Sequence, residues 1–215
     1  MSRHLFLAVF ILLGIARVKA FAQDTLVGDD ENYLEMRGKV FESKGQERDE
    51  DKVGLDSAEV KVTNESGKEV LFGLTDEKGR LDFRLPLGRK FTINISKKGY
   101  VKKMILVDTH VPADQYKVYV FTFNADIFEK IDGLDVSVLN QPVARVAFKP
   151  FDKTFSYDAA YTNKVNAGLQ KMYREYYTLK RREEQAADSA AKKPVTVKSG
   201  GSKRSVPYGQ GSRPH

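Results

Sequence analysis

Short segments in which every second residue is apolar dominate the middle of this 215-residue chain. A side chain at every second position lies on one face of a strand, so this spacing predicts half-buried antiparallel strands. Short strands repeated at intervals of roughly 8–12 residues are typical of a β-sandwich or barrel. The alternating apolar residues are Ala58, Val60 and Val62; Val70, Phe72 and Leu74; Leu81, Phe83 and Leu85; and Phe91, Ile93 and Ile95.

Turn-forming residues separate these segments. Asn64 and Asp76 each precede a glycine by three positions, at Gly67 and Gly79. An Asn or Asp side chain can hydrogen-bond the backbone two residues on, and glycine tolerates a positive φ. Both stretches are therefore predicted to be tight turns between strands.

Further strands are expected at 36–42, 101–109, 116–125 and 143–148. The segment 116–125 is apolar on both faces, with Tyr116, Val118 and Val120 on one and Tyr119, Phe121 and Phe123 on the other. A strand that is apolar on both faces is usually covered on both. We therefore expect the later part of the chain to pack over its second face.

An amphipathic helix is predicted over about 158–182, with Asp158 as its N-cap. Apolar residues recur three or four positions apart, at Tyr161, Val165, Leu169, Met172, Tyr176 and Leu179. Residues 183–215 have few large apolar side chains, so they cannot offset their ordering entropy by burial. We expect them to form a disordered basic tail.

The first 22 residues resemble a secretory signal peptide. Arg3 gives a positive start, 5–15 is a short apolar run, and Ala20-Phe21-Ala22 fits a cleavage site. A membrane anchor is the alternative, but a spanning helix needs about 20 apolar residues. We expect cleavage before Gln23, a flexible leader over 23–35, and an exported protein that lies in the periplasm or associates with the envelope and does not span the membrane. The chain has no cysteine, so neither a lipoprotein anchor nor disulfides are expected.

The net charge of +7 is unevenly distributed. Residues 180–215 hold nine Lys or Arg against three acids, whereas 23–179 hold 24 bases and 26 acids. A nucleic-acid-binding domain carries its basic residues on a folded face, so this distribution argues against a nucleic-acid partner.

Four motifs in order resemble a carboxypeptidase regulatory-like domain. They are Gly38-Lys39-Val40, the stretch from Thr75-Asp76 through Gly79 to Phe83, Leu85-Pro86-Leu87-Gly88, and Lys98-Gly99-Tyr100. The resemblance covers about 36–108 and implies a transthyretin-like antiparallel β-sandwich of about seven strands, which we place at 36–125. It further implies a non-catalytic accessory domain of the Gram-negative cell envelope. Residues 126–182 would then be a C-terminal extension.

The sequence offers no convincing catalytic, cofactor or metal site. Within the expected folded part the only histidine is His110, which we expect at a surface strand end. The carboxylates of 47–56 lack the spacing of a calcium loop, which favours a solvated charged loop. No serine lies in a nucleophile elbow. We therefore predict a protein that is not an enzyme and that needs no cofactor.

Binding to an envelope or outer-membrane protein is the leading functional prediction. The candidate partner-binding residues are Tyr173, Tyr177, Lys192, Lys193, Lys203 and Arg204. The alternative for the two tyrosines is a place in the core, and for the basic residues a solubilising end or a contact with anionic lipid. A second function, carriage of a small ligand, predicts an apolar pocket lined by Tyr119, Phe121 or Tyr161. Hydrolysis is the least favoured.

Overall fold

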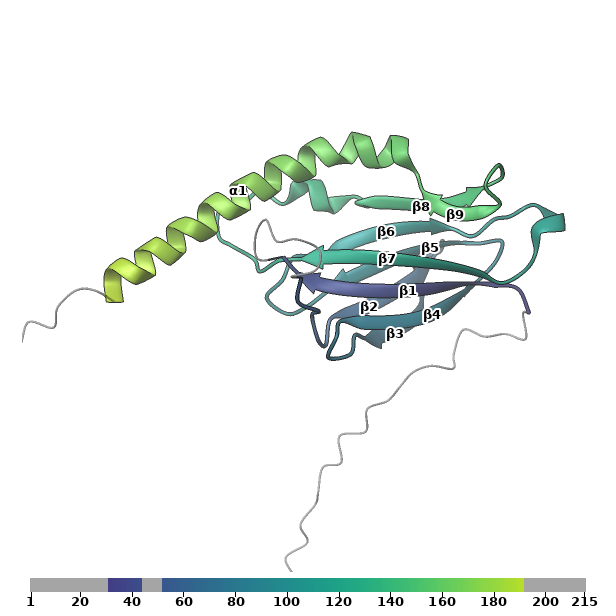
Figure 1. Cartoon of the computed structure of the whole chain (residues 1–215), viewed down its shortest axis with the longest axis horizontal. Coiled ribbons are helices and arrows are strands. Elements are labelled where there is room, and N and C mark those ends of the chain that lie inside the picture. The colour runs from purple at the N-terminus through teal and green to yellow at the C-terminus, as the bar shows by residue number, and fades with distance from the viewer. Residues whose placement is uncertain (1–30, 44–51, 192–215) are drawn as a thin grey trace, which may run out of the picture.

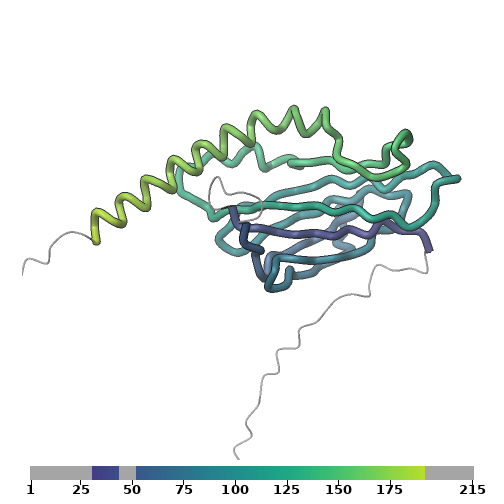
Figure 2. The backbone as a smooth tube through the Cα atoms, viewed as in Figure 1, coloured from purple at the N-terminus to yellow at the C-terminus, as the bar shows by residue number. Residues whose placement is uncertain are grey.

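Two β-sheets face each other, and one long helix runs along an open side of the pair (Figures 1 and 2). The computed structural model describes residues 31–43 and 52–191. The three-stranded sheet has the order β4 (Arg80–Pro86), β1 (Tyr33–Glu42), β7 (Tyr119–Ile127). The six-stranded sheet has the order β3 (Glu69–Leu74), β2 (Glu59–Asn64), β5 (Lys90–Ser96), β6 (Lys103–Asp108), β8 (Ala144–Lys149), β9 (Thr154–Tyr157). The 3-10 helices η2 (Ala113–Gln115) and η3 (Ser137–Asn140) lie in loops, and α1 spans Ala159–Ala191.

The predicted mainly-β sandwich with a C-terminal helix is confirmed. Most strand pairs are antiparallel, but β1 pairs with β7 and β6 with β8 in parallel. The core lies between the sheets, where alternate residues of β1 and β5 are buried, among them Leu34, Met36, Ile93 and Ile95. On the inner face of the smaller sheet, Phe83 of β4 and Phe123 of β7 meet edge to face with ring centroids 6.4 Å apart.

The two predicted turns form as expected. The Asp76 carboxylate accepts hydrogen bonds from the backbone N–H of Lys78 at 2.9 Å and of Arg80 at 2.7 Å. The bond from Arg80 is the main reason that the pKa of Asp76 is lowered. Gly79 has a φ of +75°, and a Cβ there would meet a backbone oxygen of β1 at 2.2 Å. Only glycine fits at this position.

The side chains of β3 that face the core are not the ones that the alternation predicted. Its register places Gly73 opposite Val60 on the inner side, so Phe72 and Leu74 point outward, whereas Val70, beyond the shift in register, is partly buried against the core. Phe72 and Leu74 are accordingly exposed. The side chain of Leu81 lies within 3.1–3.2 Å of the position that a Cβ of Gly73 would occupy, so it fills the space that the glycine leaves.

The segment after residue 125 completes the sandwich and is not an appendage to it. β8 pairs with β6 and β9 with β8, so the extension lengthens the larger sheet. The sandwich runs from Tyr33 to Tyr157, and the predicted limits of 36 and 125 were too narrow. The last three residues of the predicted leader already belong to β1.

The helix begins as predicted but ends later. The Asp158 carboxylate accepts a hydrogen bond from the backbone N–H of Tyr161 at 3.1 Å, as an N-cap does. The helix continues to Ala191, about nine residues past its predicted end, and residues 181–191 are all exposed. Figure 1 shows this last part projecting beyond the sheets. The rest of the predicted tail, the predicted signal peptide, most of the leader and the loop 44–51 lie outside the described residues.

Candidate functional site

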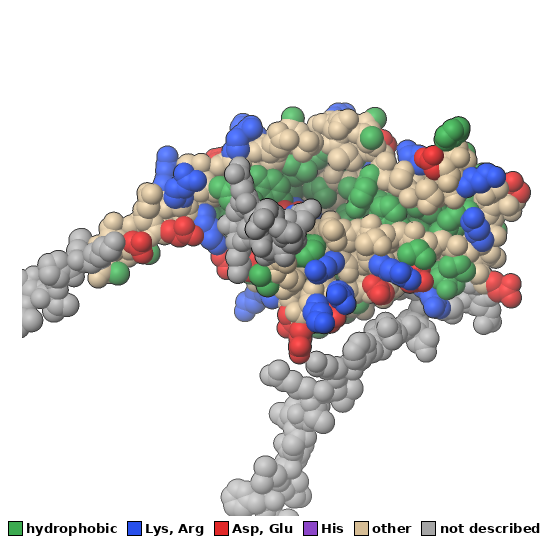
Figure 3. All heavy atoms as spheres, viewed as in Figure 1, with side chains coloured by type: hydrophobic (Ala, Val, Ile, Leu, Met, Phe, Trp, Pro, Cys, Tyr) green, Lys and Arg blue, Asp and Glu red, His purple; other side chains and the backbone are tan. Residues whose placement is uncertain are grey.

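The sandwich is open along one side, where the edge strand β7 faces β8, β9 and the start of α1 (Figure 1). We call this opening the β7 seam. In the described part of the chain β7 pairs only with β1, which leaves one of its edges without a partner strand. Figure 3 shows a band of hydrophobic side chains between the upper part of the molecule, built from α1, β8 and β9, and the sheet below it.

The direction of the β7 backbone groups follows from two hydrogen bonds at its end. The carbonyl of Ile127 accepts from the N–H of Ser43, on the β1 side, at 2.9 Å. The next carbonyl, of Phe128, accepts from Val101 on the opposite side at 3.0 Å. Because successive residues of a strand direct their backbone groups to opposite edges, the even-numbered residues 120, 122 and 124 direct theirs into the seam.

The outer face of β7 is exposed, contrary to the prediction that both faces are covered. Tyr116 is 49% exposed, Val118 44% and Val120 46%. The reason is that the C-terminal segment joins the edge of the larger sheet and does not cross the outer face of the smaller one. Neighbouring positions on that face are charged, such as Arg37 beside Thr122. The start of β7 is therefore an apolar surface beside a polar one.

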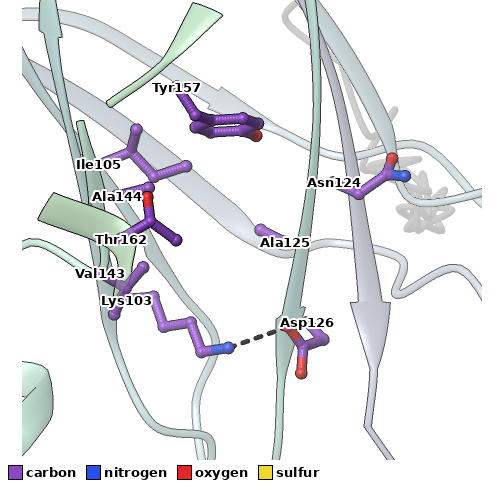
Figure 4. Close-up of a pocket in the computed structure, with 9 residues that line it drawn as sticks. All are labelled: Lys103, Ile105, Asn124, Ala125, Asp126, Val143, Ala144, Tyr157 and Thr162. Carbon is purple, nitrogen blue, oxygen red and sulfur yellow. Dashed lines mark hydrogen bonds and ion pairs between the residues drawn. The ribbon is translucent and has the colours of Figure 1, made fainter. Parts of the chain in front are cut away.

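A cavity of about 200 Å³ lies within the seam (Figure 4). Its lining is mostly apolar, with polar groups at its ends: Lys103, Ile105, Asn124, Ala125, Asp126, Val143, Ala144, Tyr157 and Thr162. Tyr157 is 39% exposed, and its ring meets that of Phe121 edge to face at 5.2 Å. An aromatic ring left open beside a hollow is a ready contact surface for another molecule.

The small-ligand prediction required a sizeable apolar pocket lined by Tyr119, Phe121 or Tyr161, and the cavity in the seam is small and differs in its lining. None of the three expected residues lines it. Tyr119 packs edge to face on Phe148 and Phe155 at 5.6 and 5.2 Å. Tyr161 donates its hydroxyl hydrogen to the carbonyl of Pro142 at 2.7 Å.

A buried polar cluster closes one end of the seam (Figure 4). The ammonium of Lys103, whose side chain is 6% exposed, lies 3.0 Å from Asp126 Oδ1 and also donates to the hydroxyl of Tyr173. That hydroxyl donates to Asp126 Oδ2 at 2.6 Å. Each of the three side chains comes from a different element, so the cluster ties α1 to both sheets.

Burial and pairing act in opposite directions on these groups. Burial lowers the pKa of Lys103, and the nearby Asp126 only partly offsets this effect. Burial also opposes ionisation of Asp126, but Lys103 and the hydrogen bond from Tyr173 outweigh it and leave the pKa of this carboxyl lowered. The pKa of Tyr173 is strongly raised, first by burial and then by the adjacent carboxylate. The cluster is therefore an ion pair fixed by a neutral tyrosine.

The structure places the partly buried Tyr173 and Tyr177 against the sandwich, and their predicted contact with a partner stays a prediction. Tyr177 shares a hydrogen bond with Ser43 at 3.0 Å and stacks on Tyr173 with ring centroids 6.1 Å apart. Both are partly buried against the core, which was the alternative interpretation. The other candidates, Lys192, Lys193, Lys203 and Arg204, lie outside the described residues.

The remaining predictions concern ions and membranes. His110 lies at the end of β6, where its Nδ1 is 2.6 Å from Asp108 and its side chain is 57% exposed, as expected. Within residues 31–43 and 52–191, no three metal-binding side chains of His, Asp or Glu come close enough to hold an ion. In the same part of the chain, no helix combines the length and apolar character needed to cross a bilayer.

The seam was missed at the sequence level because its residues are far apart in the chain. Lys103 follows Lys102 after a turn, a context in which lysine is normally solvated. Its contacts are with Asp126 of β7 and Tyr173 of α1, which the local sequence does not reveal. The one available signal was the apolar character of 116–125 on both faces.

Comparisons with known proteins do not assign the chain to a family. No model of a known protein family matches it, and no curated protein matches it in sequence. Among solved structures, the Bacillus anthracis TIE protein is 23% identical over 49% of this chain and 20% of its own, with a TM-score of 0.35. The 3-chlorocatechol 1,2-dioxygenase of Rhodococcus opacus 1CP is 13% identical over 60% of this chain and 73% of its own, also with a TM-score of 0.35. The shaft pilin SpaA of Lactobacillus rhamnosus GG is 12% identical over 46% of this chain and 52% of its own, with a TM-score of 0.32.

The chain thus spans about a fifth of the TIE protein and about half of the pilin. Similarity at these scores carries no argument about what this chain does.

Proposed function

We propose that this chain is an exported, non-enzymatic binding or scaffolding protein of the bacterial cell envelope, and that the β7 seam is its contact surface for a protein partner. One observation carries the proposal: Val118, just before the edge strand β7, and Val120 within β7 are exposed beside an apolar opening. Contiguous exposed apolar surface next to polar surface is typical of protein interaction sites.

The envelope location is supported by the sequence. The first 22 residues have the pattern of a signal peptide, and the motifs between Gly38 and Tyr100 resemble a carboxypeptidase regulatory-like domain. Such domains are non-catalytic accessories in envelope proteins. The resemblance and the export signal point to the same compartment, and an envelope or outer-membrane protein is the partner that we propose.

A small-ligand carrier is the second candidate, and the cavity of about 200 Å³ favours it. An apolar cavity of roughly 150 Å³ can hold one benzene molecule. Drug-sized ligands occupy roughly 300–1,000 Å³. The cavity is thus large enough for one ring or one side chain and small for a typical carried ligand, so we rank this function second.

A pull-down from cross-linked envelope of the source organism tests the proposal. The mature protein is compared with Val120→Glu, which places a charge on the apolar surface, and with Leu74→Glu as the matched control. Leu74 is also apolar and exposed, but it lies on the edge strand of the other sheet. We expect partners that are recovered by the wild type and by Leu74→Glu and are lost with Val120→Glu. Equal recovery by all three proteins would show that the seam is not the contact surface.

Native mass spectrometry of the same preparations separates the second function from the first. A carrier would retain a small molecule of constant mass, and Val120→Glu, which lies outside the cavity lining, would leave it bound.

A further inference from the structure

We infer that the partner contributes an extended segment, which lies in the β7 seam and adds to the free edge of β7 as a fourth strand of the smaller sheet. This inference rests on the proposed binding function and specifies the class of partner. A free strand edge recognises an extended chain of any sequence through its backbone, and neighbouring pockets select side chains.

The backbone of β7 presents the necessary groups. The N–H and C=O groups of Val120, Thr122 and Asn124 face the seam, by the alternation set out above. No hydrogen bond between elements of the described chain engages them. An exposed edge of this kind is a template for another strand. A folded helix or a compact ligand could not supply acceptors and donors at the spacing of a strand, whereas an extended peptide can.

The seam distinguishes β7 from the other strand edges. The outward side chains of β4 include Arg80, Asp82 and Arg84, which make that edge highly charged. β9 has only four residues. β3 exposes apolar side chains, but the cavity is lined by β6, β7, β8, β9 and α1, and β3 takes no part in it. Among the described strands, β7 and β9 both have an unpaired edge beside the apolar hollow, and β7, with nine residues, is the longer of the two.

The cavity indicates which pattern of side chains the bound segment should have. Successive side chains of an added strand point to opposite faces, so every second one would point toward the larger sheet and the ring of Tyr157. One of these can enter the cavity of about 200 Å³ beside Ile105 and Ala144. We therefore expect alternating apolar residues, with a Leu- to Phe-sized side chain at the cavity. The ion pair of Lys103 and Asp126 marks the polar end of the groove.

The experiment begins with a displayed library of random dodecapeptides, which is selected against the complete mature protein. The best binder is then synthesised in two N-methylated forms, one methylated at its odd and one at its even positions. Strand addition requires the N–H groups of only one alternate set, because the other set faces away from β7. We expect one form to bind at least about tenfold more weakly, as the loss of several hydrogen bonds implies, and the other to bind as the parent does. Equal affinity of the two forms would overturn the inference.

A substitution in β7 provides the reciprocal test. Thr122→Pro removes an N–H that faces the seam, and it leaves the ladder to β1 intact because proline is tolerated at an edge strand position whose N–H is unpaired. Thr122→Ala is the control, since it changes the exposed side chain and keeps the N–H. We expect Thr122→Pro to weaken peptide binding at least about tenfold and Thr122→Ala to leave it unchanged. Circular dichroism confirms that both variants are folded.

The outcomes separate this inference from the proposed function. If the selected peptide binds at the seam but is insensitive to N-methylation and to Thr122→Pro, the partner is held by side chains alone and strand addition is wrong. The envelope pull-down can still succeed in that case. If no alternating apolar peptide is selected, the inference also fails. If the peptide experiments succeed while Val120→Glu recovers every envelope partner, the strand site exists and the proposed function is wrong.

Discussion

We predict that removing Asp126 from its ion pair with Lys103 destabilises the protein more than removing Lys103 does. Asp126→Ala leaves the Lys103 ammonium in a place where its side chain is only 6% exposed. Removing one partner of a buried pair costs roughly 3–5 kcal/mol, because a buried charge is left without compensation. The side chain of Asp126 is 36% exposed, so water enters from that side, and Lys103 keeps its hydrogen bond to Tyr173, so we expect about 3 kcal/mol, at the lower end of this range.

The reverse change should cost much less. After Lys103→Met, Asp126 keeps the hydrogen bond from Tyr173 and its access to solvent. The loss of stability is then close to that of one hydrogen bond, about 1 kcal/mol.

The pH dependence of stability gives a second test of the same ion pair. Burial lowers the pKa of Lys103, and without Asp126 it falls further, so the unfolded state binds more protons below pH 10.5. The stability of Asp126→Ala should therefore rise with pH toward that value.

Urea denaturation followed by circular dichroism measures both effects. Asn124→Ala is the control for truncation, since it lies two residues away on the same face of β7 and is exposed. We expect the free energy of unfolding to fall by about 3 kcal/mol in Asp126→Ala, by about 1 kcal/mol in Lys103→Met and by roughly 0.5 kcal/mol or less in Asn124→Ala. For a domain of this size the first value corresponds to a melting temperature about 6–12 °C lower. Equal losses of stability for Asp126→Ala and Lys103→Met, or a loss for Asp126→Ala no greater than that of the control, would show that Lys103 is not a buried charge that depends on Asp126.

Three further predictions concern other parts of the fold. Thr75→Val should lower the free energy of unfolding in urea by about 2–3 kcal/mol. The buried Thr75 hydroxyl donates to the carbonyl of Leu55 at 2.6 Å and accepts from the N–H of Ala58 at 2.9 Å, and valine can do neither. A stability within about 0.5 kcal/mol of wild type would contradict this prediction. Gly79→Ala should destabilise far more than Gly67→Ala, since both have positive φ but only at Gly79 would the Cβ meet the backbone, at 2.2 Å; similar melting temperatures would contradict the clash. Burial, helped by the hydrogen bond to Glu42, raises the pKa of Tyr100 to about 12. The folded state therefore holds this proton more tightly than the unfolded state, so stability should fall as pH rises from about 10 to 12, and this fall should be smaller in Tyr100→Phe.

Local patterns predicted the strands and turns well. Period-two alternation located β2, β4 and β5, and the side chains of Asn64 and Asp76 form the expected turns. These features depend on residues adjacent in the chain. The N-cap at Asp158 was predictable for the same reason.

Features that depend on distant pairing were not predictable. In β3 the sequence Val-Leu-Phe is apolar at consecutive positions, so alternation alone does not identify the inner face. The register with β2 places Leu71 and Gly73 on that face. The outer face of β7 was expected to be covered because its composition is apolar. Whether a cover exists depends on which sheet the C-terminal strands join, and they join the other one.

The candidate site was only partly within reach of the sequence. A pocket between sandwich and helix was expected, but the prediction chose Tyr119, Phe121 and Tyr161, whose side chains pack elsewhere. Tyr157 lines the cavity because the β8–β9 pairing sets its ring beside Phe121. The helix tyrosines 173 and 177 were chosen for lying off the main apolar stripe, yet contacts from both sheets reach them.

Site-specific photo-cross-linking in living cells of the source organism tests the binding role of the β7 seam most directly. A photoreactive phenylalanine analogue replaces Thr122, which lies in the seam strand, or Glu59, an exposed residue on the outer face of the larger sheet, as the control. We expect discrete protein adducts at position 122 that are absent at position 59. Adducts at position 59 alone, or none at position 122 in folded and exported protein, would contradict it.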